Sequence, residues 1–202
     1  MKYKNVKPTT YNGMKFRSKL EARYNRIFTK FNWDFQYEPE VPELLNYQPD
    51  FVIYPKREKS DYLGEVKPIY VEIKPIREIT KLCDDPNYDT FREKIYKNWN
   101  RENDLILFGG NLFNRLDWSA IALCWQGNFS KYSGGSYGMN LSFENEDAER
   151  IGLSWHHAEL IRKNDHTYPI NGSIGDEFQR VKNYIERLWN ESWSDLRWEP
   201  KK

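Results

Sequence analysis

The sequence has few cysteines, no long apolar run and almost no net charge. Its two cysteines, Cys83 and Cys124, cannot form a disulfide framework or a CxxC zinc knuckle, which is typical of reduced intracellular proteins. No segment approaches the roughly 20 apolar residues of a membrane helix, and the first residues lack the apolar stretch of a secretory signal. We therefore expect a cytoplasmic protein without a membrane partner.

The formal net charge is only +1, from 31 basic and 30 acidic residues, which excludes a simple polycationic coat for nucleic acid. The charge is nevertheless segregated along the chain. Residues 1–31 hold nine basic residues and one acid, Glu21, whereas residues 32–50 hold five acids and no base. A charge run alone usually marks a solvated face. A basic segment beside an acidic one, however, suits a site that holds phosphates and divalent cations.

Aromatic residues are abundant. The 202 residues include 8 Trp, 14 Tyr and 11 Phe, although hydrophobic residues make up only 39% and the mean hydropathy is −0.91. The core must therefore rest on aromatic side chains. The length suits one domain with an extension, and Gly and Ser residues are concentrated over 127–140. We expect a core with a basic N-terminal arm over residues 1–126, and a loop and helical extension packed on it over residues 127–202.

Hydrophobic periodicity predicts an α/β fold. Residues 18–31 have apolar side chains at helical spacing, with Ser18 as a cap and Glu21 where a capping-box carboxylate belongs. Alternating or continuously apolar segments predict strands, and their order predicts a mixed sheet with helices packed on it. The other expected elements are strands over 35–38, 50–55, 69–74, 104–108 and 119–125, and helices over 88–101 and 176–192.

Two acidic residues fall opposite each other if the strands over 50–55 and 69–74 form an antiparallel hairpin. A turn centred on Asp61, among turn-forming Ser, Asp and Gly residues, pairs residues whose numbers sum to 122. Asp50 then lies opposite Glu72, and Lys74 shares their face of the sheet.

The motif Glu65-Val66-Lys67 competes for the same role. It would require a turn between Arg57 and Glu58, where no turn-forming residue lies. We therefore favour Glu72 and Lys74.

Opposed carboxylates are a chemical signal, because like charges about 5 Å apart on a sheet repel each other. Mg²⁺ supplies the compensating charge, since it prefers carboxylate oxygens and retained waters. We expect Asp50 and Glu72 to bind the metal, with the Ile73 backbone carbonyl as a further ligand, and Lys74 to hold or help deprotonate a water. Glu21 is the third acidic candidate, as a metal ligand, as the capping-box carboxylate, or as both.

In four ordered blocks, the sequence resembles the PD-(D/E)XK nuclease superfamily, and within it phage-borne endonucleases and the endonuclease subunits that accompany some transposases. The resemblance covers about residues 13–110. The blocks are Phe16-Arg17-Ser18-Lys19-Leu20-Glu21-Ala22-Arg23-Tyr24, Tyr37-Glu38-Pro39-Glu40, Tyr47-Gln48-Pro49-Asp50-Phe51 and Tyr70-Val71-Glu72-Ile73-Lys74-Pro75.

The resemblance implies a restriction-endonuclease-like fold and Mg²⁺-dependent hydrolysis of phosphodiester bonds, with Mn²⁺ as a substitute. Asp50 would be the central metal ligand and Glu72 the second. Lys74 would position the attacking water, and Glu21 would complete the metal site as the helix-borne acid. If the chain is phage-encoded, its location is the cytoplasm of the bacterial host.

DNA is the expected partner, and no nucleotide cofactor is expected, because Gly109-Gly110 lacks the Gly-Lys-Ser/Thr of a phosphate loop. A homodimer that cuts both strands and a monomer that nicks stay open. So does a non-catalytic or partner-dependent DNA-binding subunit of a transposition or packaging complex, with the C-terminal extension contacting another protein. The candidate phosphate-binding residues are Arg17, Lys19, Arg23, Arg26, Lys94 and Lys97.

Overall fold

The computed structural model describes most of the N-terminal half of the chain and the regular elements of the C-terminal half. The described residues are 8–42, 44, 47–55, 67–76, 89–90, 93, 102–110, 122–125, 137–144, 150–155, 158–161, 167–169, 176–194 and 196. Within these residues, no helix combines the length and apolar character needed to span a membrane.

The described elements are two helices and eleven strands. The helices are α1 (Lys19–Lys30) and α3 (Asp176–Ser194). The strands are β1 (Thr9–Tyr11), β2 (Met14–Phe16), β3 (Phe35–Tyr37), β4 (Phe51–Ile53), β5 (Ile69–Ile73), β6 (Leu105–Phe108), β7 (Ala122–Trp125), β8 (Tyr137–Glu144), β9 (Arg150–Trp155), β10 (Ala158–Ile161) and β11 (Thr167–Pro169).

A mixed sheet forms the centre of the fold. Its strands follow the order β10-β9-β8-β7-β6-β5-β4-β3, and β11 pairs with β8 beside this path. Among the described pairs, β5 and β6 run parallel and the others are antiparallel. The fold is therefore α/β with a mixed sheet, as the sequence predicts.

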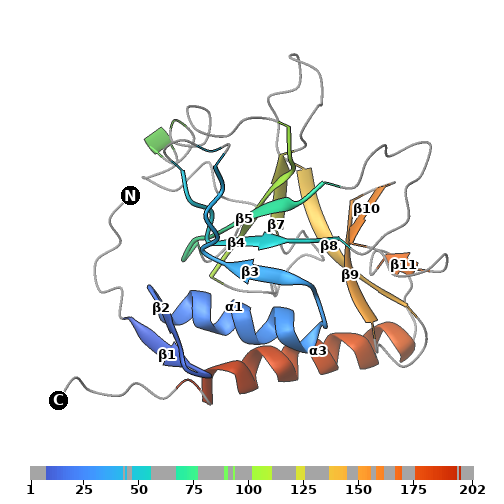
Figure 1. The fold of residues 1–202 in the computed structure, drawn as a ribbon. Coiled ribbons are helices and arrows are strands. Elements are labelled where there is room, and N and C mark those ends of the chain that lie inside the picture. Colours follow the sequence, from blue (N-terminus) through green and yellow to red (C-terminus); the bar gives the residue numbers. More distant parts are fainter. Residues whose placement is uncertain are drawn as a thin grey trace.

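Helix α1 lies against one face of the sheet, and α3 runs beside α1 (Figure 1). Tyr24, Ile27 and Phe28 of α1 pack against the sheet residues Phe51 and Phe108, and Leu188 and Trp189 of α3 join the same core. A second, smaller cluster of buried side chains covers the opposite face of the sheet, and consists of Leu44, Tyr47, Val52, Tyr70, Ile76, Leu105 and Leu107. Both faces of the central strands are thus buried, which explains their almost uninterrupted apolar sequences.

Helix α1 is delimited by capping interactions at both ends. At its start, the Ser18 side chain accepts a hydrogen bond from the Glu21 N–H. At its end, Asn32 adopts a positive φ of 54° and its N–H donates to Thr29 O, while the Trp33 N–H donates to Phe28 O. This is a Schellman motif, and the stacked rings of Phe28 and Trp33 supply its hydrophobic contact. The motif fixes where the chain turns back toward β3.

The hairpin register is confirmed. Phe51 pairs with Val71, Val52 with Tyr70 and Ile53 with Ile69, so the paired numbers sum to 122. The expected turn around Asp61 lies outside the described residues. The two faces of the hairpin are buried in different clusters, since Val52 and Tyr70 lie in the smaller cluster whereas Phe51 and Val71 lie in the core against α1.

The other expected strands of the N-terminal half and helix α3 are also present. Of the helix expected over 88–101, Asp89, Thr90 and Glu93 are described, and all three are helical. The hairpin of β1 and β2 was not predicted from the sequence. Its turn is Asn12-Gly13, with φ of 47° and 75°, a pair of positive values that suits a type I′ turn.

The expectation for residues 127–202 is wrong in one respect. A loop over 127–140 followed by helical structure was expected, but β8 begins at Tyr137 and the strands β8 to β11 occupy the segment before α3. These strands continue the sheet through the antiparallel pairing of β7 and β8. Among the described elements of this segment, α3 is the one that fits the predicted helical extension, and it packs on the core.

Candidate functional site

The predicted acidic pair lies where β4 begins and β5 ends. Asp50 directly precedes β4, Glu72 lies within β5, and Lys74 follows that strand. Continuing the hairpin register by one pair places Asp50 opposite Glu72. Both acids are buried, at 4% and 2% relative exposure. Sheet register therefore brings together the three residues that the sequence predicts to act together.

Asp50 is held by two hydrogen bonds and a further ion pair. The Ile73 N–H donates to Oδ2 over 2.6 Å, and Arg17 Nη2 donates to Oδ1 over 2.5 Å. Lys74 Nζ lies 3.5 Å from Oδ2. A backbone N–H and two cations thus converge on one carboxylate, and they lock its orientation at the edge of the hairpin.

Glu72 is held by one hydroxyl and one ammonium group. The Tyr47 hydroxyl donates to Oε1, and Lys74 Nζ donates to Oε2. Lys74 Nζ also lies 3.3 Å from the Ile73 carbonyl oxygen. Lys74 therefore contacts Glu72, Asp50 and the Ile73 carbonyl, which are the groups predicted to bind the metal.

Burial and mutual repulsion make this acidic pair electrostatically unusual. Burial, with a further contribution from the charge of Glu72, raises the pKa of Asp50 to about 7, although Lys74 acts in the opposite direction. Such a shift means that the cations present do not fully compensate two buried negative charges. Paired acids with this property occur at functional sites more often than elsewhere.

Glu21 lies at the start of α1, in a hydrogen-bond network that is linked to Asp50 through Arg17. Its Oε2 accepts from the Tyr37 hydroxyl over 2.6 Å and from the Arg17 N–H over 3.1 Å, and its Oε1 accepts from Ser18 Oγ. The capping role of Ser18 is confirmed. The reciprocal bond of Glu21 goes to the N–H of Arg17 rather than to that of Ser18, so the motif is a variant of the capping box.

The described residues contain no group of three or more His, Cys, Asp or Glu side chains arranged to hold a metal ion. Glu21 is near enough to Asp50 to raise the pKa of that carboxyl further, but within the described residues it is not grouped with Asp50 and Glu72 as a three-acid ligand set. The predicted three-acid site is thus assembled only in part, as a pair of acids with Glu21 nearby.

The pair itself fits a hydrated Mg²⁺ ion. Asp50, Glu72 and the Ile73 carbonyl offer the hard oxygen ligands that Mg²⁺ takes, and Mg²⁺ retains water in its remaining positions. Each carboxylate oxygen accepts a hydrogen bond in the structure and has a second lone pair that could face a metal. Arg17 and Lys74 supply positive charge at the same oxygens, so a metal would share the pair with them or displace one of them.

Arg17 and Arg23 have different surroundings from those expected. Arg17 pairs with Glu38 as well as with Asp50, and about half of its side chain is exposed. Arg23 is only 1% exposed, its Nε donates to Trp189 O and Ser192 Oγ, and its guanidinium stacks on the Trp189 ring. The expected phosphate contact of Arg23 is therefore wrong, because this side chain joins α1 to α3 inside the protein.

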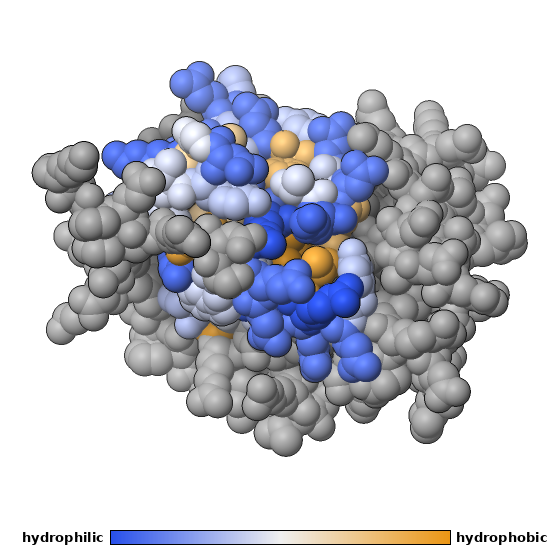
Figure 2. All heavy atoms as spheres, turned by 90° about the horizontal axis from the view of Figure 1, so that it is seen from below, coloured by the Kyte–Doolittle hydropathy of each residue, from blue (hydrophilic) through white to orange (hydrophobic). Residues whose placement is uncertain are grey.

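Of the remaining basic candidates, Lys19 and Arg26 belong to α1. On the helical side of the molecule, the described surface is mostly hydrophilic with small apolar areas (Figure 2). Arg26 is half-buried and donates to Glu191 O over 3.0 Å. Lys19 Nζ lies 4.8 Å from the ring centre of Trp193. Lys94 and Lys97 lie outside the described residues.

The sequence analysis did not assign a role to Tyr37, Glu38 or Tyr47. Tyr37 and Tyr47 each donate a hydroxyl to one predicted acid, and Glu38 pairs with Arg17. The register of β3 and β4 locates Glu38 at the site: Tyr37 pairs with Phe51, so the next residue, Glu38, lies opposite Asp50. The sequence held no comparable signal for the two phenols, since tyrosines of this chain are also common in its core.

Comparison of the chain with protein-family models, with curated proteins and with solved structures finds no match.

Proposed function

We propose that this protein is a Mg²⁺-dependent endonuclease that hydrolyses phosphodiester bonds of DNA, with a restriction-endonuclease-like fold. One observation carries the proposal: Asp50 and Glu72 are buried opposite each other at the edge of a β-hairpin, with Lys74 in contact with both. The PD…ExK pattern of the sequence indicates the same function, because that pattern requires these two acids and this lysine to lie side by side. The mixed sheet with α1 against one face is compatible with that fold.

A purely structural role accounts poorly for this pair. Buried ion pairs cost desolvation energy that their mutual attraction often does not recover. Here the two buried acids share the side chain of Lys74, and the half-exposed Arg17 pairs with Asp50. A bound divalent cation would neutralise both carboxylates and would therefore account for their burial side by side.

The residues divide the chemical tasks among themselves. Asp50, Glu72 and the Ile73 carbonyl would hold Mg²⁺, which when bound polarises the scissile phosphate and lowers the pKa of a bound water. Lys74, held between the two acids, would orient that water by hydrogen bonding. Arg17 is half-exposed beside Asp50 and would contact a phosphate of the DNA backbone. Glu21, which lies close to Asp50 at the start of α1, would add negative charge beside the metal.

A second candidate function has one observation in its favour. Arg17 and Lys74 place two permanent cations on the acidic pair without any metal. A non-catalytic DNA-binding subunit of a transposition or packaging complex could keep the acids for this ion-pair network alone. It would bind DNA in EDTA and cut nothing, or would cut only when a partner chain is added.

A cleavage panel tests the proposal. Purified protein is incubated with supercoiled, linear, branched and single-stranded DNA in Mg²⁺, Mn²⁺ or EDTA, and the product ends are mapped. We expect metal-dependent cleavage of at least one substrate, and its loss in Asp50→Asn and Lys74→Gln. Glu40→Gln is the matched control, because it removes an exposed acid from the same acidic segment. Cleavage that persists in EDTA or in Asp50→Asn would refute the proposal.

A further inference from the structure

The segment 47–50 fixes both acids of the candidate site at once. Its last residue is Asp50, whose Oδ2 accepts from the Ile73 N–H, and its first residue is Tyr47, whose hydroxyl donates to Glu72. Two hydrogen bonds therefore run from this short segment to adjacent residues of β5. These two bonds hold the end of β5 in place, and we call residues 47–50 the clamp.

The clamp is anchored on the opposite side by β3. Gln48 Nε2 donates to the Glu38 carbonyl over 2.8 Å, and the Glu38 N–H donates to the Asp50 carbonyl over 3.0 Å. Glu38 adopts a positive φ of 43°, a conformation that non-glycine residues rarely take. The segment is thus tied to the residue that follows β3 by one side-chain bond from Gln48 and one backbone bond to Asp50, on either side of Pro49.

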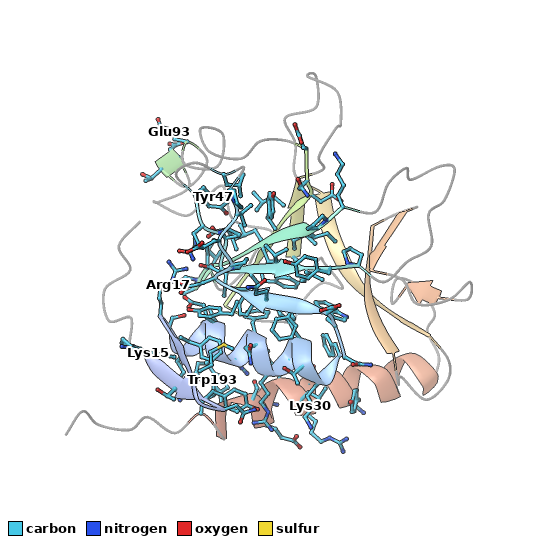
Figure 3. The ribbon with its side chains drawn as sticks, in the orientation of Figure 1. Lys15, Arg17, Lys30, Tyr47, Glu93 and Trp193 are labelled. Atoms are coloured by element: carbon cyan, nitrogen blue, oxygen red, sulfur yellow. The ribbon has the colours of Figure 1, made fainter. Side chains whose placement is uncertain are left out.

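Tyr47 is well placed to fix the rotamer of Glu72. Its ring is buried at 4% exposure among Val52, Tyr70 and Leu107, so the phenol has little freedom to move. Its hydroxyl donates to Oε1 of Glu72, which leaves Oε2 of the same carboxylate facing Lys74. Figure 3 shows Tyr47 and Arg17 at the same end of the sheet, on opposite sides of β4.

The phenol acts only as a donor to this carboxylate. A phenol hydroxyl is uncharged and has one proton to donate, which here goes to Glu72 Oε1. A neutral donor of this kind holds a carboxylate without adding the charge that would compete with a metal ion.

We propose that Tyr47 is a positioning residue for the metal site, which fixes the Glu72 carboxylate so that it and Asp50 can bind one divalent cation. The inference rests on the proposed function for the metal, and it concerns a residue to which the resemblance assigns no role. Hydrogen-bond partners of metal ligands commonly affect metal affinity by about 10-fold or more.

Tyr24 provides a matched control. It is also a fully buried tyrosine, and its hydroxyl donates over 2.8 Å to the carbonyl of Gly109 instead of to a carboxylate. Tyr24→Phe and Tyr47→Phe therefore remove the same buried hydroxyl at two places, of which one faces the acidic pair. Both variants should lose stability, so stability alone cannot distinguish positioning from packing.

The test is a Mn²⁺ titration of the full chain without DNA, followed by electron paramagnetic resonance, with circular dichroism to confirm that each variant is folded. We expect Tyr47→Phe to bind Mn²⁺ about 10-fold more weakly than the wild type, and Tyr24→Phe to bind with unchanged affinity. In cleavage assays, Tyr47→Phe should regain rate as the metal concentration rises, which a general packing defect would not produce.

The outcomes separate this inference from the proposed function. Wild-type protein that binds Mn²⁺, with Tyr47→Phe of equal affinity, overturns the role of Tyr47 and leaves the nuclease proposal standing. Equal weakening in Tyr47→Phe and Tyr24→Phe also overturns it, because the effect is then one of packing. Wild-type protein that binds no Mn²⁺ overturns both, and that result is visible before any variant is compared.

Discussion

Arg17 donates a hydrogen bond to Asp50 Oδ1 over 2.5 Å, so a permanent cation already lies on the carboxylate that we propose to be the central metal ligand. This contact reaches from the residue before the Ser18 cap of α1 to the start of β4. Helix and hairpin are therefore joined at the candidate site itself. The contact also sets up a competition between the guanidinium and a metal ion.

Replacing Arg17 should strengthen metal binding and weaken DNA binding. In Arg17→Gln, Asp50 loses a competing cation, and because the arginine is half-exposed we expect a gain in Mn²⁺ affinity of only about 2- to 5-fold. Loss of a phosphate contact should reduce the salt dependence of DNA binding by roughly one log unit per log unit of salt. Calorimetry and DNA-binding titrations at several salt concentrations measure the two effects.

Arg187→Gln is the control for this prediction, since Arg187 is exposed and pairs with Glu191 on α3. An Arg17→Gln variant whose Mn²⁺ affinity is equal to or lower than that of the wild type would show that the guanidinium does not compete for Asp50.

The stability of the metal-free protein should depend on pH through Asp50. Its folded pKa of about 7 lies above the ordinary value of 3.8, so protonation of Asp50 stabilises the fold below pH 4 and this contribution is lost as the pH rises through 7. In EDTA, the melting temperature of the wild type should therefore fall between pH 5.5 and 8.5 relative to Asp50→Asn. Thermal unfolding at both pH values measures the difference.

The groups that face Asp50 in this titration are Glu72, Lys74, Arg17 and Glu21. A gap between wild type and Asp50→Asn that stays constant with pH would contradict the raised pKa.

Replacing Arg23 should lower the stability of the fold and leave DNA affinity unchanged. Burial lowers the pKa of Arg23 to about 9, which still leaves it charged at neutral pH, and its donors hold Trp189 O and Ser192 Oγ. We expect Arg23→Met to lose about 2–3 kcal/mol in the free energy of unfolding, because buried acceptors on α3 lose a charged donor. Denaturant unfolding measures this loss.

Arg26→Met is the companion variant, because Arg26 is less buried and donates to one backbone carbonyl of α3. Its loss should be smaller, at about 1 kcal/mol. A large drop in DNA affinity for a folded Arg23→Met protein, with unchanged stability, would show that the side chain is in fact available to phosphates.

The hairpin of the candidate site was predictable because it depends on local rules. Strand register is set by side-chain alternation and by the turn, and these two place Asp50 opposite Glu72 without knowledge of any distant residue. The environment of Arg23 was not predictable in this way. Its partners on α3 lie more than 160 residues away along the chain, and helical periodicity does not distinguish a basic residue covered by another helix from an exposed one.

Two other elements that were not predicted, β8 and the β1–β2 hairpin, are nevertheless indicated by patterns in the sequence. Strand β8 alternates Tyr137, Met139, Leu141 and Phe143 with smaller or polar residues, a period-two pattern that was obscured by the preceding Gly-rich and Ser-rich stretch. The Asn12-Gly13 pair is a strong hairpin signal, but β1 and β2 have only three residues each.

Glu21 shows where the motif alone is insufficient. The sequence places it on the buried side of α1, and the structure confirms its burial. Whether it reaches the acidic pair depends on how Tyr37 and the Arg17 backbone hold it, and both draw it toward the cap of the helix.

The central claim is that Asp50 and Glu72 form a metal site for phosphodiester hydrolysis. The most direct measurement is the rate at which supercoiled plasmid is nicked or linearised in Mg²⁺, compared between wild type, Glu72→Gln and the exposed-acid control Glu40→Gln. The account predicts metal-dependent cleavage by wild type and Glu40→Gln, abolished by EDTA, and a rate at least about 100-fold lower in Glu72→Gln. Equal cleavage by wild type and Glu72→Gln, or none by wild type on any DNA with either Mg²⁺ or Mn²⁺, would contradict it.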